Sequence, residues 1–356
     1  MLFIRTARVY WRILRNVGSV MRLGRQADKI FRYYALKVFD DAGLFEYLKE
    51  PRTYGQILAE FGFADIDYTR EWLEILSTDK ENMLIHEDGL FRRNPAVEMP
   101  DINAIMARTS GTVKGFSHMA EGMTVNILPR MRQEPVILLE SFEKDGRQFL
   151  TKLDKTLGQR LYQSMRKAVF DFLTADDLRW LHSGGRLLEV GCGSGRETAE
   201  IWLRLGGKVR IVGVDPVPGI IELAQQSFPG YLKEIDPHHP PVTDENRPEF
   251  LEASATRLPF EDNSFESAMT FWMLHWTPDP RQAISELVRV VKPGGLIFGA
   301  QAFKPEANPY FDLVFRTNEN CHGMFWREDF RRWFAEHGLA VELASPVGTY
   351  RVRKPK

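Results

Sequence analysis

The chain has few cysteines, no long apolar run and almost no net charge, and each shortage excludes a class of protein. Its 356 residues include two cysteines, Cys192 and Cys321, which are too few for a disulfide framework and lack the spacing of a zinc site. No uncharged apolar stretch reaches the roughly 18 residues of a membrane-spanning helix. The net charge of −1 gives no overall nucleic-acid signature. These shortages predict a cytoplasmic globular protein without a metal site.

The first 32 residues depart from this average because they are strongly basic, with Asp28 as the single acid. Their spacings of three, four and seven put the basic side chains on one helical face. Such a helix can lie on an anionic membrane surface, or it can form the solvated face of a dimerisation helix. A transit peptide is a third reading, although serine is scarce and no cleavage signal is evident. The basic residues are Arg5, Arg8, Arg12, Arg15, Arg22, Arg25, Lys29 and Arg32.

Residues 33–95 show helical periodicity that ends in a hairpin signal. Thr53 suits the N-cap of a second helix, a third helix follows, and Asp88-Gly89 separates two short apolar runs. Three helices and a hairpin are the order of a winged-helix domain, some of which bind DNA. The third helix offers Arg70 against two glutamates, which is poor chemistry for a phosphate backbone. We therefore assign residues 1–95 to a winged-helix domain without a nucleic-acid partner.

Residues 96–180 predict a mostly helical connector or substrate lid, rich in aromatic residues and methionine. Most of these side chains suit a hydrophobic core, and some suit an apolar substrate pocket. The pocket candidates in this segment are Phe116, His118, Met119 and Met165.

From residue 181 onward, strand and helix patterns alternate, which predicts a doubly wound, mainly parallel sheet. In such a sheet the ligand lies at the carboxyl ends of the strands. The expected strands cover 186–191, 208–215, 249–254, 265–274 and 294–301, and the expected helices about 195–206, 218–227, 279–291 and 326–337.

Residues 229–248 do not fit a minimal version of this fold, because they read as a polar, proline-rich insertion. The pair His238-His239 is a nominal metal ligand set. No acidic or histidine partner stands at a familiar spacing, so a solvated loop is the favoured interpretation.

The stretch "RLLEVGCGSGRETAEI" places three alternate glycines, Gly191, Gly193 and Gly195, between an apolar strand and a helix. Glycine is needed where the backbone turns sharply or approaches a ligand closely, so this is a nucleotide loop. In a dinucleotide fingerprint a third glycine lets the helix pack closely, and here Arg196 occupies that position. The lysine of a phosphate-binding P-loop is also missing.

A carboxylate follows this loop at the end of the second strand, where Asp215 lies twenty residues after Gly195. It can accept hydrogen bonds from both ribose hydroxyls. With "LPFEDNSFESAMTFWMLHW" and "VVKPGGLIF" following in order, residues 181–356 resemble the class I methyltransferases that bind S-adenosylmethionine. The resemblance implies a Rossmann-like domain with that cofactor.

The resemblance implies a contact for each part of the cofactor. Glu189 and Gly191 resemble the residues at its methionine end, Asp215 the ribose ligand, and Pro216 to Pro218 the residues that flank the adenine. The family often has an aspartate before "LPF" that binds the adenine amino group. This chain has Ser254 and Ala255 there, and a serine offers only a weaker, neutral hydrogen bond.

The N-terminal half carries a second resemblance, through "ALKVFDDAGLFEYL", "TYGQILAEFG" and "EDGLFRRN". These segments resemble the dimerisation domain of small-molecule O-methyltransferases of the hydroxyindole and plant phenolic type, which implies a homodimer. That family's general base is a histidine after the fourth strand. Here "FWMLHW" offers His275 as the base, or as a structural residue, with Trp272 and Trp276 as substrate contacts.

These observations predict a methyltransferase that modifies a hydroxyl of an apolar or aromatic small molecule. Carbon methylation of a lipid, quinone or tetrapyrrole is the enzymatic alternative, and the basic N-terminal helix favours an amphiphilic acceptor. A regulator that binds S-adenosylmethionine without catalysis is the alternative from another class.

Overall fold

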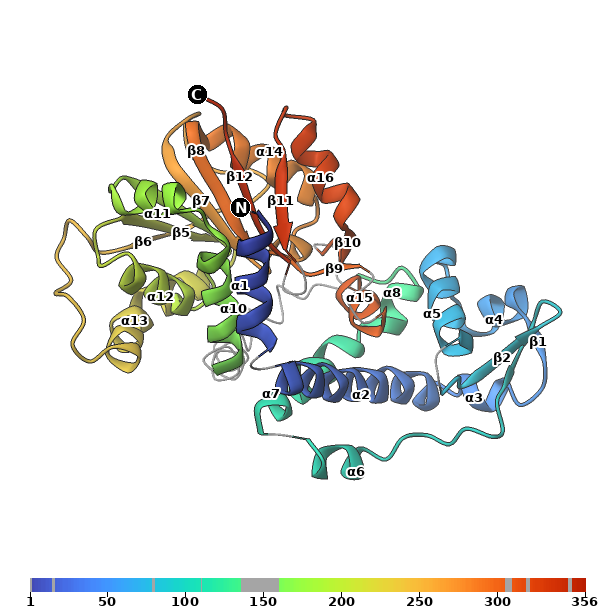
Figure 1. Ribbon diagram of the computed structural model, residues 1–356. Helices are drawn as coiled ribbons and strands as arrows, with labels where there is room; N and C mark the ends of the chain where they lie inside the picture. Colours follow the sequence, from blue (N-terminus) through green and yellow to red (C-terminus); the bar gives the residue numbers. More distant parts are fainter. Residues whose placement is uncertain are drawn as a thin grey trace. The chain divides into compact units, whose positions relative to one another are not determined.

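The computed structural model describes residues 2–14, 17–78, 81–109, 111–135, 160–304, 309–317, 321–344 and 348–356. The chain divides into two units, Met1–Val20 with Leu139–Glu306 and Met324–Lys356, and Met21–Leu138 with Ala307–Gly323 (Figure 1). The boundaries of these two units differ from those of the predicted segments, which are 1–95, 96–180 and 181–356. They differ because the first helix belongs to the larger unit, while residues near 315 belong to the smaller one.

The larger unit is built on a mixed sheet of seven strands in the order β11-β12-β8-β7-β4-β5-β6. The five strands from β8 to β6 run parallel. At one edge β12 is antiparallel to β8, and β11 is antiparallel to β12, so β11 again runs in the direction of the five. The five parallel strands were predicted from the sequence, whereas this edge pair was not. The strands are β4 (Arg186–Val190), β5 (Arg210–Asp215), β6 (Glu249–Glu252), β7 (Phe265–Phe271), β8 (Val291–Ala300), β11 (Val341–Ala344) and β12 (Thr349–Arg353).

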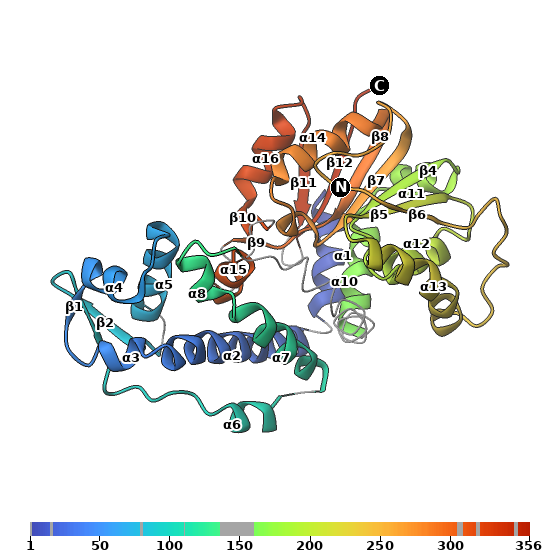
Figure 2. The same cartoon turned by 180° about the vertical axis from the view of Figure 1, so that it is seen from behind.

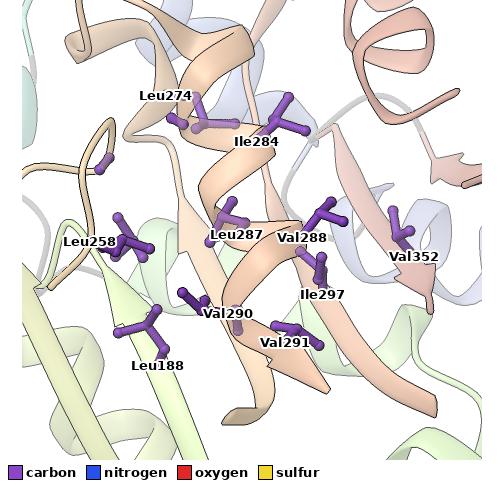
Figure 3. Close-up of a cluster of buried hydrophobic side chains, with 14 of the residues drawn as sticks. Leu188, Leu258, Leu274, Ile284, Leu287, Val288, Val290, Val291, Ile297 and Val352 are labelled. Atoms are coloured by element: carbon purple, nitrogen blue, oxygen red, sulfur yellow. The ribbon is translucent and has the colours of Figure 1, made fainter. Parts of the chain in front are cut away.

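Helices cover both faces of this sheet (Figures 1 and 2). Successive strand residues point to opposite faces. Leu187 therefore packs with α10 (Arg160–Phe172), α11 (Ala175–His182), α12 (Arg196–Arg204) and α13 (Pro218–Ile235). Leu188 packs on the other face with α14 (Pro280–Val290) and α16 (Arg327–Ala335). Figure 3 shows part of this second core, with Leu188 near residues of α14 and β8.

Helix α13 corrects the prediction of a loop from residue 229. The helix continues to Ile235 with Pro229 inside it. Phe228 and Leu232 are both buried on either side of the proline, so packing holds the helix together where propensity would break it. His239 Nδ1 bonds to the carbonyl oxygen of Pro240, and no cluster of metal-ligating side chains exists among the described residues.

The N-terminal helix α1 (Leu2–Leu14) lies beside α10, as both views show (Figures 1 and 2). Val9 is buried at this contact. Arg5 pairs with Glu342 and donates to the carbonyl oxygen of Phe172, and Arg12 pairs with Asp171. Arg5 and Arg12 therefore face the fold, which corrects the prediction of a solvated basic face at these two positions. Across the described residues, no helix is both long and apolar enough to cross a membrane.

The smaller unit has the predicted succession of helices followed by a hairpin. Thr53 caps α4 in a capping box with Gln56, and Asp88 and Gly89 adopt positive φ in the turn between β2 and β3. The hydroxyl of Tyr68 donates to the carbonyl oxygen of Leu313 (2.7 Å), which ties α15 to α5. The elements are α2 (Val17–Asp41), α3 (Leu44–Tyr47), β1 (Arg52–Thr53), α4 (Tyr54–Phe61), α5 (Ile66–Thr78), β2 (Leu84–Glu87), β3 (Leu90–Arg93), α6 (Ile102–Ala107), α7 (Gly111–Thr124), α8 (Ile127–Met131) and α15 (Pro309–Phe315).

Candidate cofactor site

The glycine loop joins β4 to α12, and all three of its alternate glycines adopt positive φ. A Cβ on Gly191 would lie 2.7 Å from the Cβ of Met273, and one on Gly195 would lie 3.3 Å from Ala224. A Cβ on Gly193 would meet no atom within 4 Å. Gly191 and Gly195 thus serve packing within the protein, whereas Gly193 borders open space that a ligand can enter.

Asp215 ends β5 with each carboxylate oxygen held by a backbone amide. Gly193 donates its N–H to Oδ2 (3.2 Å), and Val217 donates its N–H to Oδ1 (3.3 Å). Burial raises the pKa of Asp215 to about 6, despite these two hydrogen bonds. Each oxygen keeps lone-pair capacity for a further donor. The carboxylate is therefore oriented to accept two hydroxyls, as a ribose ligand must.

Glu189 lies in the buried part of β4 and accepts a hydrogen bond from the hydroxyl of Thr198 (2.6 Å). Burial raises the pKa of Glu189 to about 8. A buried carboxylate of this kind is stabilised in its charged form by a nearby cation. The methionine end of S-adenosylmethionine carries an ammonium and a sulfonium, so this environment fits the predicted cofactor.

The predicted adenine side of the site is made by the ends of β5 and β6. Ala253 donates its N–H to the carbonyl oxygen of Asp215 (3.0 Å), which holds these two strand ends together. Pro216 is exposed and Ala255 is buried. The Ser254 hydroxyl accepts from the Thr256 N–H (3.3 Å) and shares a hydrogen bond with the hydroxyl of that residue (2.9 Å). Ser254 is thus already engaged locally.

The chain leaves β7 through a strained aromatic corner. Trp272 has φ 48°, a left-handed conformation that costs a bulky residue about 1–2 kcal/mol. Its N–H donates to the carbonyl oxygen of Ala300 (2.8 Å), and its ring meets Tyr162 edge-on with centroids 5.8 Å apart. Met273 follows against Gly191. Backbone strain of this kind is typical of functional sites, and here it turns the chain beside the glycine loop.

His275 lies in the short 3₁₀ turn Leu274–Trp276 after β7 and is almost completely buried. Its Nδ1 is 3.2 Å from Nε2 of Gln301, which also donates to the carbonyl oxygen of Ala302 (2.9 Å). If the Gln301 amide were turned over, its Oε1 would face the carbonyl oxygen of Ala302, and two acceptors would repel each other. With the Gln301 amide in this orientation, its nitrogen donates to Nδ1, which puts the proton of the neutral imidazole on Nε2. Burial lowers the pKa of His275 to about 3.

The predicted substrate residues fall into three groups. Met165 and Trp272 pack against one small core in the larger unit, and Trp276 lies beside His275. Met119 is buried on α7 in the smaller unit. The side chains of Phe116 and His118 lie outside the described part of the chain.

Three residues that contact predicted site residues were not found from the sequence. Thr198, Tyr162 and Gln301 contact Glu189, Trp272 and His275 respectively, and each comes from another element. No spacing in the sequence marks them, because their role depends on which elements the fold brings together.

Comparison with known proteins finds methyltransferases. A family model described as a methyltransferase domain matches residues 188–299. A demethylmenaquinone methyltransferase of Desulfitobacterium hafniense is 27% identical over 165 residues, which cover 46% of this chain and 61% of that protein. The O-methyltransferase rstn1 of Aspergillus nomiae is 31% identical over 136 residues, which cover 38% of this chain and 55% of that protein. The matches thus span between half and two thirds of these relatives.

Two solved structures share the fold along nearly the whole chain. The CurJ carbon methyltransferase has a TM-score of 0.67 at 15% identity and covers 98% of this chain and 99% of its own. The CMeT domain of the citrinin polyketide synthase has a TM-score of 0.70 at 12% identity, and the match covers 99% of this chain and 96% of that domain. The larger unit of this protein is a class I methyltransferase domain, and its cofactor is S-adenosylmethionine.

Proposed function

We propose that this protein methylates a carbon atom of a small, apolar acceptor whose oxygen substituent activates that carbon, such as a quinol. The arrangement at His275 carries the proposal, because its Nε2–H can donate a hydrogen bond but cannot accept a proton. The similarity to a demethylmenaquinone methyltransferase also supports an acceptor of the quinone class.

Bound S-adenosylmethionine supplies an electrophilic methyl group for an in-line displacement. Glu189, which Thr198 orients, would hold the positive charge at the methionine end, and Asp215, which two backbone amides orient, would hold the ribose through its two oxygens. Gly193 lets the backbone approach the ligand. Holding both reactants in place would account for much of the rate enhancement in a reaction between two bound molecules.

His275 acts on the acceptor in this proposal. Negative charge on a phenolic or enolic oxygen is shared with the neighbouring ring or α carbon, which makes that carbon nucleophilic. A hydrogen bond from Nε2–H would stabilise this charge after the hydroxyl proton has passed to solvent. The carbon–methyl bond would form as the methyl–sulfur bond breaks, S-adenosylhomocysteine would leave, and the proton on the methylated carbon would then pass to solvent. The low pKa of His275, caused by its burial, keeps the imidazole neutral throughout the physiological range.

Methylation of a hydroxyl is the second candidate, favoured by the resemblance to phenolic O-methyltransferases and by the relative rstn1. In that reaction His275 would accept the hydroxyl proton on Nε2. This requires the other tautomer, with Nδ1–H facing a Gln301 nitrogen that is itself a donor. The observed contact therefore favours carbon as the methylated atom.

We further propose that the helices and hairpin of the smaller unit form a winged-helix dimerisation domain, and that the enzyme works as a cytoplasmic homodimer. Helix α5 supports a packing role, because Tyr68, Trp72 and Leu73 are buried. Its single arginine, Arg70, pairs with Asp67 and lies over the ring of Tyr54. The apolar character of α5 speaks against a regulator that reads DNA.

The test is to supply methyl-labelled S-adenosylmethionine with a naphthoquinol lacking one ring substituent, or with a catechol, and to assign the product by NMR. We expect a new aryl methyl signal from the quinol and little product from the catechol. A methoxy signal would replace the proposal with O-methylation. Binding of the cofactor without transfer to either acceptor would contradict both candidates, and Asp215→Ala serves as the control without cofactor binding.

A further inference from the structure

Helix α1 turns arginine side chains toward the protein and aromatic side chains outward, which is the opposite of an ordinary surface helix. Arg5 is buried, with its guanidinium on Glu342 and on the carbonyl oxygen of Phe172, and Arg12 pairs with Asp171. Moving charged groups out of water is unfavourable, and their pairing offsets this only in part. An amphipathic helix that folded for stability alone would turn its apolar side inward.

The outward side of α1 is apolar and aromatic. Phe3 is 84% exposed, Trp11 62%, Ile4 57% and Tyr10 41%. Positions 3, 4, 7, 10 and 11 share one helical face, so these side chains form a continuous surface together with Ala7. Ten large hydrophobic side chains are exposed among the described residues, and five of them are on this helix. A patch of this kind marks an interaction surface, whereas single exposed residues do not.

The charges on α1 indicate which kind of partner binds its exposed apolar surface. Arg8 is exposed next to the aromatic residues, and the chain has no acidic residue before Asp28. Aromatic side chains that bridge water and hydrocarbon, together with an arginine and no acid, match an anionic lipid interface. We propose that α1 docks on an anionic membrane surface, with Phe3 and Trp11 among the lipid chains and Arg8 at the headgroups.

Contacts within the protein hold α1 in this orientation in the absence of a membrane. Glu342, which holds Arg5, also pairs with Arg351, and Arg351 donates to Asp177 (3.1 Å). This chain of ion pairs connects α1 to β11, β12 and α11, and it stabilises the orientation in which the aromatic side of α1 is exposed. Docking therefore needs no refolding, which lowers the entropy loss on binding. The proposal concerns localisation and does not depend on the methyl acceptor.

The test is flotation of the full chain with vesicles of phosphatidylcholine alone or with roughly 30% phosphatidylglycerol. We expect binding to the anionic vesicles. Trp11→Ser and Phe3→Ser should each lower the partition coefficient roughly tenfold, since each removes a large apolar side chain from the interface. Arg8→Glu should lower it roughly fivefold or more on anionic vesicles only.

Trp326→Ser is the matched control, because Trp326 is 49% exposed on β10 (Phe325–Trp326), away from this helix. It should leave binding unchanged, and thermal unfolding should show that all variants fold. Quenching by brominated lipid should disappear in Trp11→Phe and persist in Trp326→Phe. Equal flotation of wild type and helix variants would overturn the proposal. Loss of a dimer in Trp11→Ser, without vesicle binding by the wild type, would instead assign the surface to a second copy.

Discussion

The side-chain nitrogen of Gln301 faces Nδ1 of His275 across 3.2 Å, and this contact determines which imidazole nitrogen carries the proton. The same nitrogen donates to the carbonyl oxygen of Ala302, so the amide cannot reverse without opposing two oxygens. In this tautomer the second ring nitrogen of His275 is a hydrogen-bond donor. A histidine identified by position alone could equally have been the general base.

Replacing Gln301 by glutamate should reverse this tautomer. A carboxylate at this position accepts a hydrogen bond from Nδ1–H and raises the pKa of His275, because it stabilises the protonated ring. If Nε2–H stabilises an oxyanion, Gln301→Glu should lower kcat about a hundredfold. The measurement is the turnover of a labelled quinol over a pH series.

The matched variants are His275→Gln, which can keep a donor, and His275→Ala, which cannot. We expect partial activity in the first and a loss of about a hundredfold or more in the second. Higher activity in Gln301→Glu, with a new acidic limb in the pH profile, would identify His275 as a base instead.

Cofactor binding should be coupled to proton release at Glu189. Burial raises the pKa of this carboxyl to about 8, so the ligand-free protein holds it mostly protonated at about pH 7. A cationic ligand favours the carboxylate, and binding must then expel the proton. The affinity should rise between about pH 6 and pH 8, and calorimetry in buffers of different ionisation enthalpy should count the released proton.

Two variants separate this effect from other titrations. Glu189→Gln should bind more weakly and release no proton at this site. Thr198→Val removes the hydroxyl that donates to Glu189, so it should raise the pKa of the carboxyl further and weaken binding at about pH 7. An affinity that is independent of pH in the wild type would contradict the coupling.

Gly191 and Gly193 should respond differently to alanine. Gly191→Ala forces a Cβ to within 2.7 Å of Met273 at positive φ, so we expect unfolding to become easier by roughly 2 kcal/mol or more. Gly193→Ala meets no protein atom within 4 Å, so only the backbone strain of about 1 kcal/mol remains.

The difference between the two sites is visible when stability and binding are measured together. Gly193→Ala should stay folded in a denaturant titration yet lose cofactor binding by about tenfold or more, because its methyl group enters ligand space. Normal binding by Gly193→Ala would place the cofactor away from this backbone.

The parts of the site that follow one another along the chain could be predicted from the sequence. The glycine loop and Asp215 stand at fixed distances within one strand-helix-strand unit, and the apolar runs define the five parallel strands. Helix α13 shows where local signals fail, because burial of Phe228 and Leu232 overrides the break expected at Pro229.

Contacts between distant segments lay beyond local patterns. Arg5 meets Glu342 across almost the whole chain, so the periodicity that put the arginines on one face gave no information about which way that face turns. Gln301 likewise reaches His275 from the next strand of the sheet. Strands β11 and β12 were missed because they pair antiparallel with each other, and β12 pairs antiparallel with β8, outside the repeating parallel pattern.

Asp215→Asn should stabilise the ligand-free protein near neutral pH while it weakens binding. The folded state raises the pKa of Asp215 to about 6, through burial, from about 4 in an unfolded chain. Between these values the native state binds more protons than the unfolded state, so this group's contribution to stability falls as pH rises through the window. Asparagine does not titrate, but its NH2 would face one of the two backbone N–H donors. The variant should therefore be more stable than wild type by about 1 kcal/mol at about pH 7, and less stable than wild type at about pH 4. Urea unfolding at both pH values measures this difference in stability.

The lost charge-assisted hydrogen bonds should weaken cofactor binding by Asp215→Asn by about tenfold to a hundredfold. A variant less stable than wild type at about pH 7 would mean that the amides of Gly193 and Val217 stabilise the carboxylate more than burial penalises it.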